Sequence, residues 1–92
     1  MYSGLLCIFV YVLRSTLDRQ LYVGFSTKLR DRLLTHNAGK VRSTKSRRPW
    51  HLVFFECYSN KSDALRREQY FKTTMGKRAL KLMLRHTLQQ EK

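Results

Sequence analysis

Two short strand-like runs of hydrophobic residues stand near the start of the chain. The longest apolar run covers residues 5–13, and a second run covers residues 20–25. Both are rich in the β-branched and aromatic residues that favour strands. Between them, Ser15, Asp18 and Gln20 are typical of a turn. The pattern predicts a β-hairpin made of residues 6–13 and 20–25.

Two tyrosines of this hairpin are expected to lie together. If the hairpin is symmetric about residues 16 and 17, Tyr11 lies directly opposite Tyr22. Opposed residues of an antiparallel pair share a face, so we expect the two hydroxyls to emerge side by side. Gly24 follows on the second strand, where the lack of a side chain would let a ligand approach the backbone closely.

A short helix is predicted after the hairpin. Ser26 or Thr27 offers an N-cap, and Leu29 and Leu33 recur at the spacing of an inward-facing pair. Gly39 supplies the C-terminal stop after residue 37.

The second half of the chain predicts one strand and two helices. Residues 50–58 form the most strand-like stretch of the sequence. Asn60 begins a capping-box pattern for a helix over residues 61–74, which we expect to stop near Gly76. A basic helix over residues 77–87 follows.

The predicted order is β-β-α-β-α-α, which indicates an α+β fold with one small sheet and helices against it. The 92 residues contain no internal repeat and no Pro/Gly-rich linker. We therefore expect one domain over residues 1–92, with its core at about 6–76 and a basic C-terminal helix at about 77–87.

The charge of the chain points to a polyanionic partner. Nineteen basic and six acidic residues give a formal net charge of +13. Such an excess favours DNA, RNA or an anionic membrane surface. The run of residues 5–13 is too short to span a bilayer and lacks the flanks of a signal peptide, so we expect no membrane segment.

The two cysteines, Cys7 and Cys57, are too few and too far apart for a zinc motif. Both lie in strand-like runs. We expect them to be reduced, buried small hydrophobes in a cytosolic protein.

Glu68 is the unusual carboxylate of the sequence. Ala64, Glu68, Phe71 and Met75 recur at spacings of four, three and four, which trace one face of a helix. That face is otherwise apolar, so the Glu68 carboxylate must be paired, hydrogen-bonded or bound to a metal. From the residues alone, a salt bridge to an arginine and a metal ligand both stay open.

Arg32 and His36 lie four residues apart and share a face of the first helix. Arginine is suited to the charge that develops on a phosphodiester, because it is always charged and donates a planar fork of hydrogen bonds. The alternatives are a surface charge for Arg32 and a helix-end cap for His36.

The loop of residues 39–48 is a second candidate for phosphate contacts, ahead of Trp50. It can neutralise phosphates and hydrogen-bond them, whereas the plain alternative is a solvated loop. Its candidate binding residues are Lys40, Arg42, Thr44, Lys45, Arg47 and Arg48.

These motifs together resemble the GIY-YIG nuclease superfamily, and most closely its small stand-alone members. The resemblance covers roughly residues 9–75. It is carried by Phe9-Val10-Tyr11, Tyr22-Val23-Gly24, Arg32, His36-Asn37 and Glu68. Phe9 stands where the first signature has glycine. The resemblance implies an antiparallel three-stranded sheet flanked by helices.

The resemblance also implies roles for these residues. Glu68 would hold a divalent metal, magnesium or manganese, and Arg32 would be the catalytic arginine. His36 would contact the phosphate or assist proton transfer. Tyr11 would accept a proton from the attacking water and Tyr22 would orient water or phosphate, although the sequence leaves open which tyrosine is the base.

We therefore expect a metal-dependent endonuclease that hydrolyses DNA, with a role in repair or recombination and selectivity for a DNA structure. The alternative is a non-catalytic nucleic-acid-binding module on the same scaffold. A third possibility is a domain that cuts only when a protein partner presents the substrate. The expected location is the cytoplasm, at the nucleoid in a bacterium. RNA as substrate and the oligomeric state stay open.

Overall fold

The computed structural model describes residues 6–90 of the chain. Strands β1 (Ile8–Ser15), β2 (Leu21–Ser26) and β3 (Trp50–Tyr58) form one antiparallel sheet in the order β2-β1-β3. The helices are α1 (Leu29–Asn37), α2 (Lys61–Phe71), α3 (Thr74–Met83) and α4 (Arg85–Gln90), with a 3-10 turn η1 (Lys45–Arg47). The α+β fold with a three-stranded antiparallel sheet is thus confirmed.

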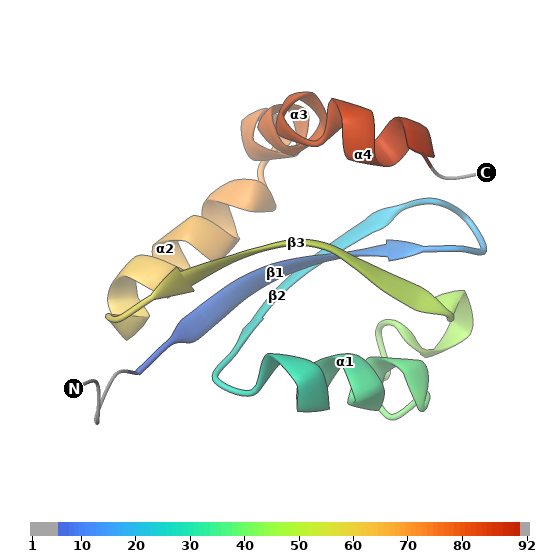
Figure 1. Ribbon diagram of the computed structural model, residues 1–92, viewed down its shortest axis with the longest axis horizontal. Coiled ribbons are helices and arrows are strands. Elements are labelled where there is room, and N and C mark those ends of the chain that lie inside the picture. The colour runs from blue at the N-terminus through green and yellow to red at the C-terminus, as the bar shows by residue number, and fades with distance from the viewer. Residues whose placement is uncertain (1–5, 91–92) are drawn as a thin grey trace.

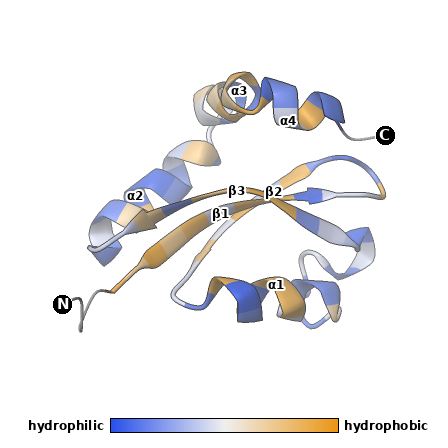
Figure 2. Cartoon of the chain, in the orientation of Figure 1, coloured by the Kyte–Doolittle hydropathy of each residue, from blue (hydrophilic) through white to orange (hydrophobic). Residues whose placement is uncertain are grey.

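Helices cover both faces of the sheet (Figure 1). Helix α1 lies on one side, and α2, α3 and α4 lie on the other. Alternate residues of β1 supply both cores, and Figure 2 shows this central strand as largely hydrophobic. Val10 and Val12 pack with residues of α2 and α3, while Tyr11 and Leu13 pack with Trp50 and residues of α1.

The hairpin register differs from the predicted one by two residues. Tyr11 lies opposite Gly24, and Tyr22 lies opposite Leu13, so the expected direct opposition of the two tyrosines is wrong. The cause is a longer turn, closed by a hydrogen bond from the Ser15 N–H to the Gln20 carbonyl. Because a shift of two residues preserves the face, Tyr11 and Tyr22 still share the face that α1 covers.

Helix α1 ends as predicted but begins differently. Its N-cap is Lys28, which makes no side-chain cap, so the expected cap by Ser26 or Thr27 is wrong. The Ser26 hydroxyl oxygen accepts the Lys28 N–H instead. At the other end Gly39 has a φ of 79° and donates to the His36 carbonyl, which completes a glycine-terminated helix.

The helix after β3 is shorter than predicted. Helix α2 ends at Phe71, and α3 starts at Thr74 after the N-cap Thr73, whose hydroxyl accepts the Gly76 N–H. Gly76 therefore does not stop a helix. A Cβ at this position would collide with the Tyr70 carbonyl, so the glycine allows α3 to pack closely against the end of α2.

Two further expectations change with this break. Ala64, Glu68 and Phe71 are buried on one face of α2 as predicted, but Met75 lies in α3 and is 72% exposed. The predicted helix over residues 77–87 is divided between α3 and α4. Within residues 6–90, no helix combines the length and apolar character that a membrane span requires.

The cysteines form a disulfide, so the expectation of two reduced, buried thiols is wrong. Cys7 and Cys57 are joined with their Cα atoms 5.3 Å apart, and Cys57 is exposed at the edge strand β3. Phe9 lies opposite Cys57, so Cys7, two residues earlier, is the diagonal neighbour on the same face. The pairing depends on the β1–β3 register, which the sequence does not state.

Candidate active site

The phenol ring of Tyr11 lies across the backbone of Gly24. A Cβ at Gly24 would stand 2.5 Å from the Tyr11 hydroxyl oxygen, so only glycine leaves room for this ring. The space above Gly24, where the sequence suggests a bound ligand, holds a side chain of the protein itself. Gly24 thereby fixes where the Tyr11 hydroxyl lies.

A chain of hydrogen bonds runs from Tyr11 through α1 into the basic loop. The Tyr11 hydroxyl oxygen is 2.9 Å from Nε2 of His36, and Nδ1 of His36 is 2.8 Å from the Thr44 hydroxyl oxygen. The Thr44 hydroxyl donates to the Val41 carbonyl. Since that hydroxyl uses its hydrogen there, we assign the His36 proton to Nδ1, and Nε2 accepts the Tyr11 hydrogen.

Arg32 completes this cluster, one helical turn before His36 as the sequence predicts. Its Nε–H donates to the Tyr11 hydroxyl oxygen at 3.4 Å. Arg32 is partly exposed, whereas Tyr11 is 1% and His36 0% exposed. The guanidinium therefore stands between the buried tyrosine and solvent.

Both buried groups of the cluster are held neutral. Burial raises the pKa of Tyr11 above its ordinary value of 10.0, and outweighs the opposite effect of Arg32. Burial, followed by the charge of Arg32, lowers the pKa of His36 to about 4. In the metal-free protein the charge of Arg32 does not make the phenolate the favoured form of Tyr11, because desolvation is the larger effect.

Tyr22 is the partly exposed tyrosine of the pair. Its ring centroid lies 5.1 Å from that of His36 and 6.0 Å from that of Trp50, both in tilted or edge-on contact. The described part of the chain offers its hydroxyl no hydrogen-bond partner. Tyr22 thus brings an unused hydroxyl to the same cluster.

Glu68 stands on the buried face of α2. It is 8% exposed, and its negative charge contributes slightly to the raised pKa of Tyr11. Its Oε2 is 2.8 Å from Nζ of Lys72. The partner is a lysine rather than the arginine considered from the sequence. The spacing of four residues could have revealed it.

The residues near Glu68 fit a hydrated magnesium ion rather than a fully protein-bound metal. Within residues 6–90, no three His, Cys, Asp or Glu side chains gather as a metal-binding group. Magnesium keeps several waters and is often held by one or two carboxylates together with substrate phosphates. Glu68 can supply that single carboxylate once the Lys72 ammonium moves away.

The basic loop divides into structural and exposed residues. Thr44 is fully buried against His36, and its carbonyl accepts the Trp50 indole N–H. Arg47 donates from Nε to Asp18 at 2.9 Å, which ties the loop to the hairpin turn. The exposed cationic side chains, for which phosphate binding stays a prediction, are Lys40, Arg42, Lys45 and Arg48.

Asn37, beside His36, holds the start of β3. Its side-chain amide donates to the Trp50 carbonyl at 3.0 Å, and its oxygen accepts the Trp50 N–H at 2.6 Å. The sequence indicates Asn37 only as the neighbour of His36. In the structure it fixes α1 to the sheet, and so fixes where His36 and Arg32 lie.

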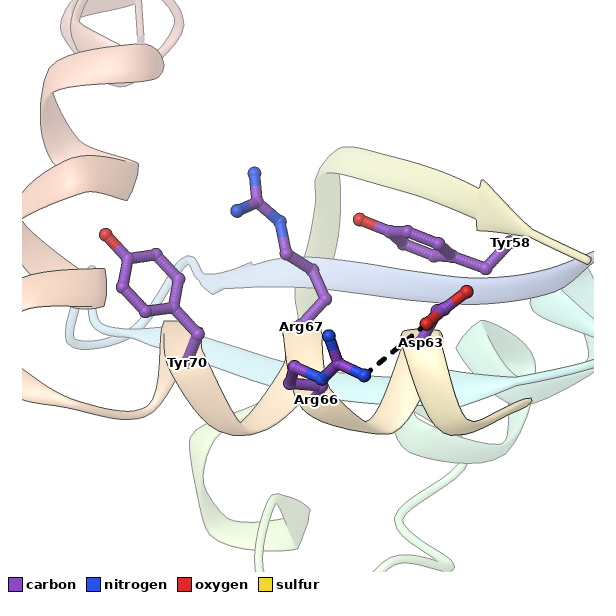
Figure 3. A pocket seen from close by; sticks show the side chains of 5 residues that line it. All are labelled: Tyr58, Asp63, Arg66, Arg67 and Tyr70. Carbon is purple, nitrogen blue, oxygen red and sulfur yellow. Dashed lines mark ion pairs between the residues drawn. The ribbon is translucent and has the colours of Figure 1, made fainter. Parts of the chain in front are cut away.

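A hollow of about 480 Å³ lies on another face of α2 (Figure 3). Arg67 is hydrogen-bonded to both carboxylate oxygens of Glu56, and Arg66 pairs with Asp63 at 3.7 Å. Both arginines of this hollow therefore have acidic partners, and it presents little net charge to a polyanion.

Comparison with known families identifies the whole arrangement. A family model described as the GIY-YIG catalytic domain matches residues 7–81. The match includes Tyr11, Tyr22, Arg32, His36 and Glu68.

Relatives of similar size also align with most of the chain. A UPF0213 protein of Staphylococcus haemolyticus is 43% identical over 76 residues, which are 82% of this chain and 92% of the relative. A UPF0213 protein of Bacillus pumilus is 41% identical over 71 residues, 76% of this chain and 71% of the relative. Comparison with solved structures gives no match.

Proposed function

The chain belongs to the GIY-YIG family, and on this premise we propose that it is a metal-dependent endonuclease that hydrolyses DNA phosphodiester bonds. Members of the family are generally endonucleases. We extend the proposal to a structure-selective enzyme of DNA repair or recombination. The observation that carries it is the hydrogen-bonded cluster of Arg32, Tyr11 and His36, together with a buried Glu68 carboxylate whose charge acts on Tyr11.

Arg32 would stabilise the charge of the transition state. Its contact to Tyr11 uses only Nε, and the other guanidinium nitrogens have no hydrogen bond within residues 6–90. These nitrogens can donate to the non-bridging oxygens of a phosphodiester, where negative charge grows as water attacks. Tyr11 would keep the guanidinium in place before the substrate arrives.

The same contact would control access to Tyr11. At 3.4 Å the bond from Arg32 to the phenol is long, so a phosphate can replace the phenol as its acceptor. The shift of Arg32 towards the phosphate would uncover the Tyr11 hydroxyl for the attacking water. The free protein would thus keep its proton acceptor covered until substrate binds.

Tyr11 and His36 would then take the proton of the attacking water. Tyr11 would receive it on the phenolic oxygen while passing its own hydrogen to Nε2 of His36, 2.9 Å away. Thr44 would hold Nδ1 of His36 throughout, and Tyr22 would orient the water or phosphate with its unused hydroxyl. A magnesium or manganese ion on Glu68 would supply Lewis-acid stabilisation of the leaving oxygen.

A cleavage assay tests the proposal. The purified chain is incubated with labelled duplex, flap, branched and single-stranded DNA, and with matching RNA, in magnesium, manganese or a chelator. We expect metal-dependent cleavage of at least one DNA substrate. Arg32→Ala and Glu68→Gln, purified identically, should be inactive, which separates the activity from a contaminating nuclease. Wild-type and variant preparations with equal activity would contradict the proposal.

A second candidate function is nucleic-acid binding without cleavage. It is favoured by the Lys72–Glu68 ion pair, which satisfies the buried carboxylate without a metal. The same assay separates the two candidates. Tight DNA binding without cleavage, with every metal and substrate, would support the binding module. Cleavage that appears only in cell extract would point to a protein partner that presents the substrate.

A further inference from the structure

A second hollow, of about 420 Å³, lies between the edge strand β2 and helix α3. We call it the β2–α3 groove. It adjoins the catalytic cluster through two shared residues. Tyr22 lines the groove and packs its ring against His36, and Lys72 lines the groove and pairs with Glu68. A ligand in the groove would therefore lie next to the proposed site of cleavage.

The rim of the groove is cationic. Four of its lining residues are basic and none is acidic: Arg19, Lys72, Lys77 and Lys81. Of these, only Lys72 has an acidic partner in the described part of the chain. This is the opposite of the hollow in Figure 3, where both arginines are paired with carboxylates. The unpaired cations favour a polyanionic ligand.

The inner wall of the groove is apolar. Leu21 and Tyr22, which are partly exposed, line it together with the buried core residues Val23, Phe71 and Leu80. An intact duplex presents mainly phosphates and sugars to such a surface, because its bases are stacked inside. A nucleotide with an unpaired base instead offers an apolar ring face together with a phosphate.

From this combination we propose that the β2–α3 groove binds an unpaired nucleotide of the DNA strand next to the scissile phosphate. Its base would lie on Leu21 and Tyr22, the exposed part of the apolar wall, and its phosphates on the rim. The preferred substrate would accordingly carry a single-stranded segment adjoining the cut. The inference rests on the proposed nuclease function for the place of cleavage, but the binding itself needs no cleavage.

Binding without metal tests the groove. Fluorescence anisotropy measures the affinity of the full chain, in a chelator, for labelled oligothymidylate and for an abasic strand of equal length and charge. We expect the wild type to prefer oligothymidylate, because the abasic strand lacks a base for the apolar wall. Equal affinities would overturn the proposal that an unpaired base is bound.

Two charge-reversal variants locate the site. Lys77→Glu/Lys81→Glu changes the rim, while Arg78→Glu/Arg85→Glu makes the same change of net charge on α3 and α4 outside the groove. We expect the rim variant to weaken oligothymidylate binding at least roughly tenfold more than the control. Equal weakening by both variants would place the binding surface elsewhere.

Arg19 offers a variant with little risk to the fold. Its φ of 62° lies in the left-handed region that glycine adopts freely. We expect Arg19→Gly to weaken oligothymidylate binding without lowering the melting temperature, and unchanged binding would remove Arg19 from the rim. If the wild type cleaves DNA but the groove variants bind oligothymidylate normally, only the groove proposal is contradicted. If the groove variants lose binding as expected but the wild type cleaves nothing, only the nuclease proposal is contradicted.

Discussion

The hydroxyl of Tyr11 lies 2.9 Å from Nε2 of His36, and this contact links the central strand of the sheet to helix α1. Both residues are almost completely buried, so the bond forms in a low-dielectric environment where an unmade bond is costly. Within residues 6–90, the hydrogen bonds that connect the Arg32 side chain to Thr44 run through this pair. The cluster should therefore respond as a unit to substitution.

Thr44 provides the first test of that unit. In Thr44→Val the Nδ1–H of His36 loses its acceptor at 2.8 Å, so the tautomer that accepts the Tyr11 hydrogen is no longer fixed. We expect kcat for DNA cleavage to fall about 10- to 100-fold with little change in KM, as for other supporting residues of active sites. Thr44→Ser keeps the hydroxyl and should retain most of the activity. Equal kcat values for the two variants would leave Thr44 with a packing role.

The lowered pKa of His36 predicts a pH dependence of stability. In the unfolded chain His36 takes up a proton near its ordinary pKa of 6.5, whereas in the folded protein it does so only near pH 4. The neutral form is favoured by folding, so its contribution is complete above pH 6.5 and is lost as the pH falls towards 4.

Urea unfolding at several pH values measures this effect. We expect the free energy of unfolding to fall by on the order of 1 kcal/mol per pH unit in the upper part of that window. His36→Gln should lose this slope while keeping any contribution from carboxylates at lower pH. An unchanged slope in the variant would assign the titration to another group.

Arg32 should matter for turnover more than for binding. Its free guanidinium nitrogens would face a phosphate whose charge grows in the transition state, so Arg32→Ala should lower kcat on the order of a hundredfold and weaken DNA binding far less. Arg32→Lys should restore little, because lysine keeps the charge without the planar fork. Single-turnover cleavage and anisotropy on the same preparations compare the two effects. Parallel losses would make Arg32 an ordinary phosphate contact.

The sequence predicted the parts of this site that depend on local spacing. Arg32 and His36 share a helical face, and Glu68 lies on the buried face of α2, because both relations follow from the 3.6-residue period. The end of α1 at Asn37, two residues before Gly39, follows likewise from a local backbone requirement.

Long-range relations could not be predicted in the same way. The hairpin register depends on the turn after Ser15, and the disulfide depends on how β3 meets β1. The pattern of the sequence also does not reveal that Thr44, in a basic loop, turns inward to His36. Each of these contacts depends on how two segments are placed in space, and the local residue pattern does not predict that placement.

The exposed cations of the basic loop should control the salt dependence of DNA binding. In Lys40→Ala/Arg42→Ala/Lys45→Ala, we expect the slope of log K against log salt to decrease by up to about one unit per lost phosphate contact. Arg47→Ala is a contrasting variant, because it breaks the ion pair that ties the loop to Asp18. We expect it to lower the melting temperature and to change the salt slope less than the triple variant does. An unchanged slope in the triple variant would exclude the loop from the interface.

Variants of Glu68 and Lys72 test whether Glu68 is a metal ligand or one half of a structural ion pair. The Lys72 ammonium, 2.8 Å from the carboxylate, occupies the position that a cation bound to Glu68 would need. Lys72→Met should therefore lower the magnesium concentration that gives half-maximal cleavage, since one competitor is removed while the aliphatic part of the side chain is kept. Glu68→Gln should abolish metal-dependent cleavage and leave DNA binding intact or tighter, because a negative charge near the phosphate is gone.

Thermal melting of the same variants distinguishes a metal ligand from a structural ion pair. Lys72 is half exposed, so the ion pair itself should contribute only about 0–1 kcal/mol, and Lys72→Met should shift the melting temperature little. If the pair is instead the reason for a carboxylate at this position, both variants should melt at clearly lower temperatures, and the magnesium requirement of Lys72→Met should match that of the wild type. That outcome would make Glu68–Lys72 a structural ion pair. Lower melting temperatures of both variants, combined with a wild type that cuts no substrate, would favour the binding module.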